Sequence, residues 1–150
     1  MQTELVTSIS KVDPAAWDQL AGADDPFVEH AFLSALEQSG SVGPGSGWLP
    51  QHMLLRANGA LLGALPLYLK EHSYGEYVFD FGWANAAMRA GIRYYPKLVS
   101  MVPFTPATGR RFLIAPGADE QAVVSGLLDG VLDARQALRA SSYESVRTCL

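Results

Sequence analysis

The sequence contains few of the residues on which several common kinds of site depend. Cys149 is the only cysteine, so no disulfide framework can form and a reducing compartment is expected. The three histidines stand at positions 30, 52 and 72, without the spacing of metal ligands, so no metal site is predicted. No Gly-x-Ser-x-Gly elbow, P-loop or dinucleotide fingerprint occurs. The sequence therefore leaves the catalytic residues unknown.

Long hydrophobic runs are also missing. The longest apolar stretch, 60 to 69, is too short to span a bilayer and contains Gly63 and Pro66. Residues 1 to 5 have neither the basic nor the apolar segment of a secretory signal. These two observations predict a cytoplasmic protein without a membrane partner.

Positive charge is scarce. Eleven Lys and Arg residues stand against fifteen Asp and Glu, a net charge of −4, which argues against nonspecific nucleic-acid binding. One small basic patch is expected between 93 and 111, where Arg93, Lys97, Arg110 and Arg111 have only neutral residues between them. The patch could face an anion, although a solvated rim is the commoner case.

The composition itself is that of a folded domain. The chain has 150 residues, of which 49% are hydrophobic and 17% charged. A chain of this length can bury roughly two-thirds of its unfolded surface, so a single domain with a packed core is expected.

The first third of the chain predicts one strand, two short helices and a loop. Each helix opens with Asp-Pro, an N-cap followed by proline at the first helical position, and closes at a glycine. The loop holds four glycines and is either a mobile flap or a plain connection. The elements are a strand at 4–10, helices from Asp13-Pro14 to Gly22 and from Asp25-Pro26 to Gly40, and the loop at 39–47.

The rest of the chain predicts an α/β (α+β) sandwich with a mixed, mostly antiparallel sheet flanked by helices. Asn58-Gly59 supplies a type I′ turn between two strands, and the return strand is apolar on both faces until Pro66 interrupts it. Gly126 and Gly130 mark the flank of the longest helix, where another backbone can approach. The further elements are strands at 51–57, 60–69, 77–81, 98–102 and 112–115, and helices at 84–90 and 119–139.

The stretch from 94 to 110 is the most informative segment. Pro103 and Pro106 each fix a φ angle, and Lys97 and Arg110 place a cation at either side of the loop. Such a loop either holds its shape against a ligand or is a rigid surface turn.

Five segments, in one order between residues 13 and 140, carry a family resemblance. They are Pro26-Phe27 with His30 to Glu37, Gly63 to Lys70, Ser73 to Asp80, Tyr94 to Lys97, and Pro103 to Gly109. Together they resemble the FemAB-like predicted N-acyltransferases, also described as peptidoglycan biosynthesis/recognition proteins. The resemblance implies a GNAT-like fold, two such domains in tandem, and acyl-CoA or aminoacyl-tRNA as donor for a full-length relative.

The loop in which a GNAT-like domain binds the pyrophosphate of acyl-coenzyme A has changed here. It would span Ala115 to Glu120, with one glycine, with Pro116 that donates no N–H, and with two carboxylates at the helix start. Those carboxylates would repel a pyrophosphate, so no cofactor site is expected in this chain. The donor would sit on a second domain, and this chain would shape the acceptor groove.

Aromatic, hydroxyl and cationic side chains are the candidates for binding a small-molecule, peptide or glycan acceptor. Lys97, Arg110 and Arg111 would hold an anionic group, and the loop from 103 to 109 would position it. Glu76 and Asp80 lie four apart, either as base candidates or on an exposed sheet edge. The predicted substrate-binding residues are Tyr68, Tyr94, Tyr95, Lys97, Phe104, Thr105, Thr108 and Arg110.

Two alternatives stay open: a peptide- or glycan-binding module that transfers nothing, and an inactive truncated product. Residues 1–140 are predicted to form the N-terminal domain, and residues 141–150 an atypical tail that makes a poor strand. We therefore expect either a truncated chain, inactive alone, or a short stand-alone member of the family. Truncation would leave a sheet edge uncovered and favour self-association.

Overall fold

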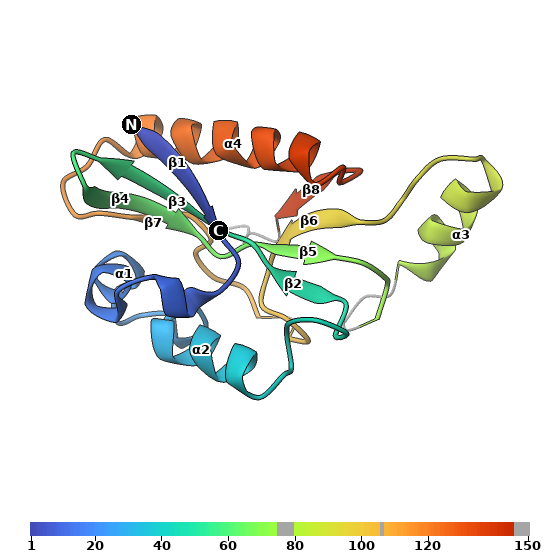
Figure 1. Ribbon diagram of the computed structural model, residues 1–150, viewed down its shortest axis with the longest axis horizontal. Helices are drawn as coiled ribbons and strands as arrows, with labels where there is room; N and C mark the ends of the chain where they lie inside the picture. Colours follow the sequence, from blue (N-terminus) through green and yellow to red (C-terminus); the bar gives the residue numbers. More distant parts are fainter. Residues whose placement is uncertain (75–79, 106, 146–150) are drawn as a thin grey trace.

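The computed structural model describes residues 1–74, 80–105 and 107–145. Strands form a middle layer, with helix α4 (Glu120–Ala137) over one face and helices α1 (Pro14–Ala21) and α2 (His30–Gln38) over the other (Figure 1). Helix α3 (Phe81–Arg89) projects from one end of the molecule, away from these layers. The predicted α/β sandwich is confirmed.

The strands of the described residues form two four-stranded sheets. The first has the order β1 (Gln2–Val6), β3 (His52–Ala57), β4 (Ala60–Leu65), β7 (Leu113–Ile114), and the second β2 (Trp48–Pro50), β5 (Tyr68–Lys70), β6 (Lys97–Ser100), β8 (Tyr143–Ser145). Every named pair is antiparallel except β6 with β8, which is parallel. The prediction of a mixed, mostly antiparallel arrangement is therefore confirmed.

The two sheets are halves of one bent surface. Only Gln51 separates β2 from β3, and only Pro66 and Leu67 separate β4 from β5. At the bend the N–H of Gln51 donates to the carbonyl of Leu67 at 2.8 Å, which joins the two sheets. Because proline has no N–H to donate, pairing is interrupted at Pro66, as predicted.

The hairpin between β3 and β4 has the expected turn. Asn58 and Gly59 have φ angles of 51° and 81°. Positive φ at both central residues defines a type I′ turn, whose twist matches that of the flanking strands.

The N-terminal helix signals are confirmed for α1 and shifted for α2. The Asp13 carboxylate accepts from the N–H of Ala16 at 2.8 Å, and Gly22 caps the end of α1 with φ 69°. The Asp25 carboxylate instead accepts from the N–H of Phe27 and caps a short 3₁₀ helix. The Asp-Pro signal is thus satisfied before α2, which begins only at His30.

The first strand is shorter than predicted. It ends at Val6, because the Ser8 hydroxyl accepts from the N–H of Ser10 and caps a 3₁₀ helix over Ile9–Lys11. A serine can satisfy the backbone locally in this way and so compete with strand pairing.

Helix α4 packs closely on the sheet through its glycines, as predicted. A Cβ built on Gly130 would lie 2.8 Å from Cγ2 of Thr3 and 2.9 Å from the sulfur of Met53. A Cβ on Gly126 would lie 3.1 Å from the methyl groups of Leu55. The core under α4 contains further buried side chains, among them Leu65, Leu67, Leu98, Val123, Leu127 and Val131.

Two other predictions near the C-terminal half need correction. A strand does follow α4: β8 runs parallel to β6, and Tyr143 packs against the core under α4 although its neighbours are polar. The strand predicted at 77–81 lies outside the described residues except for Asp80 and Phe81. Phe81 begins α3, so the helix predicted at 84–90 starts three residues earlier.

The lengths and hydrophobicity of the described helices bear on membrane insertion. None of them is long and apolar enough to cross a membrane.

Candidate functional site

The strands β2, β5 and β6 place Trp48, Lys70 and Lys97 side by side. Trp48 pairs with Lys70, and Lys70 pairs with Lys97, so all three side chains lie on one face of the sheet. Tyr68 lies on the same face, two residues before Lys70. We call these four residues the polar face. The opposite face of the same strands carries Leu49, Leu69 and Leu98, which pack under α4.

Lys97 is the most strongly held member of the polar face. Its side chain is 2% exposed, and its ammonium group donates to Oδ2 of Asp80 at 2.8 Å and to Oε2 of Glu144 at 3.1 Å. The same nitrogen lies 4.9 Å from the ring centre of Tyr94 and 5.2 Å from that of Tyr95. Two carboxylates and two aromatic rings therefore compensate for the burial of this charge.

Asp80 holds the outer side of this cluster. The Tyr95 hydroxyl lies 2.7 and 2.9 Å from the two carboxylate oxygens of Asp80 and 3.0 Å from the hydroxyl of Ser73. Burial by itself would raise the pKa of Asp80, but hydrogen bonds from Lys97, Ser73 and the tyrosines hold that pKa well below its ordinary range. Asp80 is therefore an ionised carboxylate that orders its neighbours.

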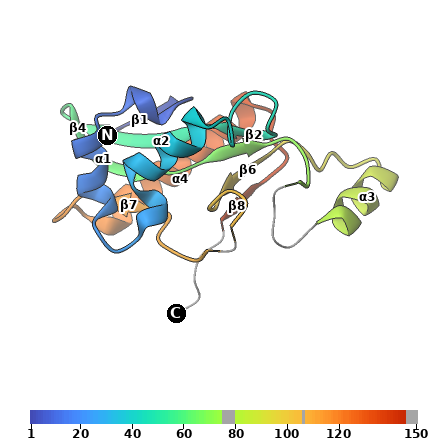
Figure 2. The same cartoon turned by 90° about the horizontal axis from the view of Figure 1, so that it is seen from below.

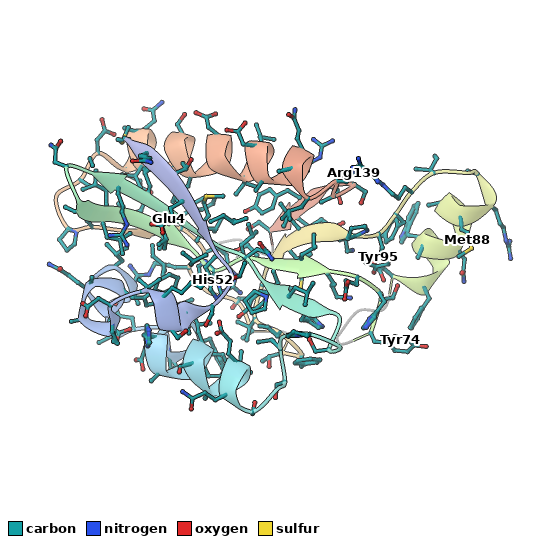
Figure 3. The ribbon with its side chains drawn as sticks, in the orientation of Figure 1. Glu4, His52, Tyr74, Met88, Tyr95 and Arg139 are labelled. Carbon is teal, nitrogen blue, oxygen red and sulfur yellow. The ribbon has the colours of Figure 1, made fainter. Side chains whose placement is uncertain are left out.

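Burial and the Asp80 carboxylate raise the pKa of the Tyr95 hydroxyl. Tyr95 is therefore a neutral phenol that donates its hydrogen. Figure 3 places Tyr95 between the start of β6 and helix α3.

Lys70 lies between Trp48 and Tyr95. Its ammonium group lies 5.2 Å from the ring centre of Trp48 and 5.4 Å from that of Tyr95, and it donates to the carbonyl of His72. The Trp48 indole N–H in turn donates to the carbonyl of Tyr74 at 3.3 Å. The aromatic and cationic side chains thus form one continuous row across three strands.

His52, which packs against the ring of Tyr68, forms a polar pair with Glu37. His52 is fully buried, and its Nδ1 accepts from the N–H of Leu67 at 3.3 Å, so Nε2 carries the proton that faces Glu37 Oε1 at 3.3 Å. Glu37 also accepts from the N–H of Ile9 at 2.9 Å and from the Ser8 hydroxyl at 2.6 Å. Burial would raise the pKa of Glu37, but these hydrogen bonds lower it.

The loop between β6 and β7 brings Phe104 over the polar face. Phe104 has a φ of 60°, which a bulky residue rarely adopts, and its side chain is 48% exposed. Its ring centre lies 5.5 Å from that of Trp48. Such backbone strain costs about 1–3 kcal/mol, and it persists only where the surroundings enforce it.

The same loop is anchored at its base by arginines. Arg110 donates to the carbonyl of Ala21 at 2.6 Å, at the end of α1. Arg111 is buried and donates to the carbonyl of Ala107 at 2.8 Å. Burial lowers the pKa of Arg111, and the charge of Asp25 opposes that change.

The predicted site residues divide into two groups. Tyr68, Tyr94, Tyr95, Lys97 and Phe104 gather on or beside the polar face, and Thr105 follows Phe104. Arg110 lies at the base of the loop, beside α1, and Thr108 is exposed on the same loop.

The predicted basic patch is not one continuous surface. Lys97 is buried between carboxylates and Arg111 is buried in the loop, whereas Arg93 and Arg110 are exposed. Charges close in sequence thus lie in separate environments. That these residues bind an anion stays a prediction.

Four residues beside the predicted ones were not predicted as members of the site: Trp48, Lys70, His52 and Glu37. The alternation of the return strand already places Lys70 on the face of Tyr68. The position of Trp48 follows only from the pairing of β2 with β5. Glu37 and His52 come from a helix and a strand whose packing no local pattern predicts.

The N-terminus of α4 carries two carboxylates. The Asp119 carboxylate accepts from the N–H of Ala122 at 3.1 Å, and the N–H of Ala118 donates to Ala115 at 3.1 Å. Glu120 adds a second carboxylate in the first turn. One N–H donor of the first turn is therefore engaged, and two carboxylates oppose the positive end of the dipole that would attract an anion.

Of the two candidate bases, the structure describes only Asp80. Glu76 lies outside the described residues, and Asp80 is held as an ionised carboxylate by Lys97 and Tyr95. Within 1–74, 80–105 and 107–145, no group of three His, Cys, Asp or Glu side chains could hold a metal ion.

Comparisons with known proteins identify a family and a fold for this chain. The FemAB-like family model, described as peptidoglycan biosynthesis/recognition, matches residues 8–147. A search of curated proteins finds no match.

Among solved structures, two N-acetyltransferases share the fold. An aminoglycoside antibiotic 6′-N-acetyltransferase from Acinetobacter haemolyticus superposes with a TM-score of 0.52 at 13% identity, over 99% of this chain and 80% of that one. A ribosomal-protein-alanine N-acetyltransferase from Brucella melitensis biovar Abortus superposes with a TM-score of 0.55 at 11% identity, over 99% and 82%. The predicted GNAT-like fold is confirmed.

Proposed function

The chain belongs to the FemAB-like peptidoglycan biosynthesis/recognition family, and from that premise we propose that it recognises the acceptor in an N-acyl transfer reaction. The acceptor would be a small molecule, peptide or glycan that offers an amine. It would bind at the loop and tyrosines that cover the polar face.

The observation that carries this proposal is the strained Phe104 held against Trp48. An exposed aromatic ring with φ 60°, above a buried row of aromatic and cationic side chains, is the kind of strain that clusters at ligand-binding positions. Tyr94 and Tyr95 are partly exposed at the other end of this row, and Thr105 adds a hydroxyl next to Phe104. Lys70 and Lys97 are buried, so their part is to hold the tyrosines in place.

The acyl donor fits poorly at α4 of this chain. The pyrophosphate of coenzyme A needs open N–H groups, whereas Asp119 occupies one of them and Glu120 adds repulsion. We place the donor, acyl-CoA or aminoacyl-tRNA, on a second domain of the same fold. The role of this chain is then to orient the acceptor.

Asp80 supports this division of labour. A general base works best with a pKa near the operating pH, and the pKa of Asp80 lies well below it. Asp80 therefore orients Lys97 and Tyr95 and leaves proton transfer to a group elsewhere.

One competing function is a peptide- or glycan-binding module that transfers nothing. The carboxylates at the start of α4 and the lowered pKa of Asp80 fit both the acceptor-recognising domain and the binding module. Transfer to an amine acceptor by a longer form of the protein separates them, because the binding module yields no acylated product.

Calorimetric titration with acetyl-coenzyme A tests the placement of the donor. We expect no saturable heat from residues 1–150, with an N-acetyltransferase known to bind acetyl-coenzyme A as the positive control. Saturable binding at micromolar concentration would place a donor site in this chain and overturn the proposal.

A further inference from the structure

Helix α3 is apolar and exposed, in contrast to the other helices. It has no buried residue, and it projects beyond the end of the sheets in both views (Figures 1 and 2). Trp83, Met88 and Ile92 are 76%, 72% and 63% exposed, and Tyr74, on the chain leading toward α3, is 65% exposed. We call α3 with Tyr74, Ile92 and Arg93 the α3 knob.

Exposed apolar side chains concentrate on this knob. Of the eight large hydrophobic residues exposed in the described part of the chain, five lie between 74 and 92. Trp17 and Trp48 are fully buried, so Trp83 alone of the three tryptophans faces solvent. An exposed apolar cluster of this kind marks an interaction surface.

The charge of the knob differs in sign from that of the whole chain. Between Phe81 and Tyr95 the only charged residues are Arg89 and Arg93, both exposed, although the net charge of the chain is −4. The described residues of the knob therefore combine aromatic and aliphatic side chains with two cations, and Asp80, which precedes α3, is bonded to Lys97. This combination is complementary to a surface that is apolar inside and anionic outside.

We propose that the α3 knob docks the protein on an anionic lipid surface. Tyrosine and tryptophan prefer the boundary between headgroups and acyl chains, and arginine keeps its charge at the phosphates while its stem lies along apolar surface. Trp83 and Met88 would enter this boundary, and Arg89 and Arg93 would bind lipid phosphates. The nine-residue helix would lie in the interface and would not span the bilayer.

The shape of the knob favours lipid over a protein groove. Phe81 and Trp83 stand two positions apart on the helix and so point to different sides, which makes the helix apolar over much of its circumference. Lipid adapts to such a convex surface without a preformed complementary groove. Figure 3 shows Met88 and Tyr74 at this outer end of the molecule, with Tyr95 inward of them.

Docking would also bring the polar face near the lipid surface. Asp80, which precedes α3, is bonded to Tyr95 and Lys97, so the knob is tied to the polar face at its base. The proposal does not depend on acyl transfer, because lipid binding and donor binding are measured separately.

Vesicle co-sedimentation of the 150-residue chain tests this proposal. Vesicles of phosphatidylglycerol and phosphatidylcholine are compared with vesicles of phosphatidylcholine alone, at low and high salt. We expect binding to the anionic vesicles, weakened by salt, and a blue shift of tryptophan emission from Trp83. Loss of both arginines in the double variant Arg89→Gln, Arg93→Gln should weaken binding about 25-fold, at roughly fivefold for each charge near the surface.

A matched pair of variants separates the knob from general hydrophobicity. The double variant Trp83→Ala, Met88→Ala should lower binding at least tenfold, whereas Leu132→Ala, which removes a 52% exposed side chain from α4, should leave it unchanged. Because α3 has no buried residue, circular dichroism melting should show all variants folded.

Three results would overturn the proposal. One is equal binding to neutral and anionic vesicles, and another is binding that Leu132→Ala weakens as much as the knob variants do. The third is a dimer in light scattering that the knob variants dissociate, without vesicle binding, which would assign the surface to a second copy of the chain.

Discussion

At the scale of single residues, burial separates the ion pairs that matter from those that do not. Lys97 and Asp80 have side chains 2% and 12% exposed, whereas Arg56 and Glu4, which bond at 3.1 Å, are 34% and 51% exposed. An exposed pair contributes about 0–1 kcal/mol, and removing one partner of a buried pair costs several times more. The contact between Lys97 and Asp80 is therefore expected to contribute more to the free energy of unfolding than the exposed pair does.

This contrast predicts how stability depends on pH. The pKa of Asp80 is lowered in the folded protein, so the unfolded chain binds more protons as acid is added. The stabilisation is complete above the unfolded pKa of about 4 and is lost as pH falls from about 5 toward the lowered folded value. Asp80→Asn should reduce stability at pH 7 and make the fall between pH 5 and pH 2 shallower.

Urea unfolding at a series of pH values measures this slope. Glu37 also has a lowered pKa, so part of the slope should remain in Asp80→Asn. Glu4→Gln, which removes an exposed partner of Arg56, is the matched control and should keep the full slope. An unchanged slope in Asp80→Asn would show that its contacts with Lys97 and Tyr95 do not persist in solution.

Single residues also show where sequence reasoning ends. The aromatic residues and Lys97 could be predicted as site members because they cluster in sequence between 94 and 104. The burial of Lys97 could not, since its partners come from distant segments. The pairing of β6 with β8 brings Glu144 to it, and Asp80 reaches it from the start of α3. Phe104 is predicted as part of the loop from 103 to 109, and nothing local indicates its positive φ.

At the scale of elements, the glycines of α4 set how closely the helix approaches the sheet. An alanine at Gly130 would gain about 1 kcal/mol of helix propensity, but its methyl group would overlap Thr3 and Met53, an overpacking cost of about 1–3 kcal/mol. We predict that Gly130→Ala lowers the free energy of unfolding by about 1 kcal/mol.

Gly82→Ala in α3 is the matched control for this prediction, measured by thermal and urea unfolding. No atom lies within 4 Å of a Cβ built there, so only the propensity gain applies and stability should hold or rise. A Gly130→Ala protein as stable as Gly82→Ala would mean that α4 can move away from the sheet without cost.

Elements with strong local signals were predicted, and those stabilised by distant contacts were not. The Asn58-Gly59 turn, the cap of α1 and the long α4 follow from local chemistry. Strand β8 has few apolar residues, and its place comes from backbone pairing with β6, which no periodicity in 141–145 reveals. The start of α2 shifted because Asp25 capped a 3₁₀ helix first.

At the scale of the whole molecule, the bent sheet divides the protein into a core and a site. One face of β2, β5 and β6 packs under α4 with leucines, and the other carries the polar face, covered in part by the loop from 101 to 112. The fold class follows from the order of elements. The position of the site at the bend follows from two sheets meeting at Gln51 and Leu67, which the sequence does not display.

At this scale, acceptor recognition and lipid docking involve neighbouring parts of the molecule. Strands β2, β5 and β6, which carry the polar face, lie inward of α3 (Figure 1). A protein docked by Trp83, Arg89 and Arg93 would present Tyr95 and Phe104 close to the lipid boundary. Acceptor recognition and surface docking would then take place at one end of the molecule.

The central claim is that the acceptor binds over the polar face and not at the end of α4. Titration with a peptidoglycan stem peptide that carries a free amine, followed by amide and indole chemical shifts, tests it most directly. We predict saturable shifts at the Trp48 indole and at the amides of Tyr94, Tyr95 and Phe104, weakened in Phe104→Gly. Shifts confined to 118–121 at the start of α4, or no saturable shifts, would contradict the account.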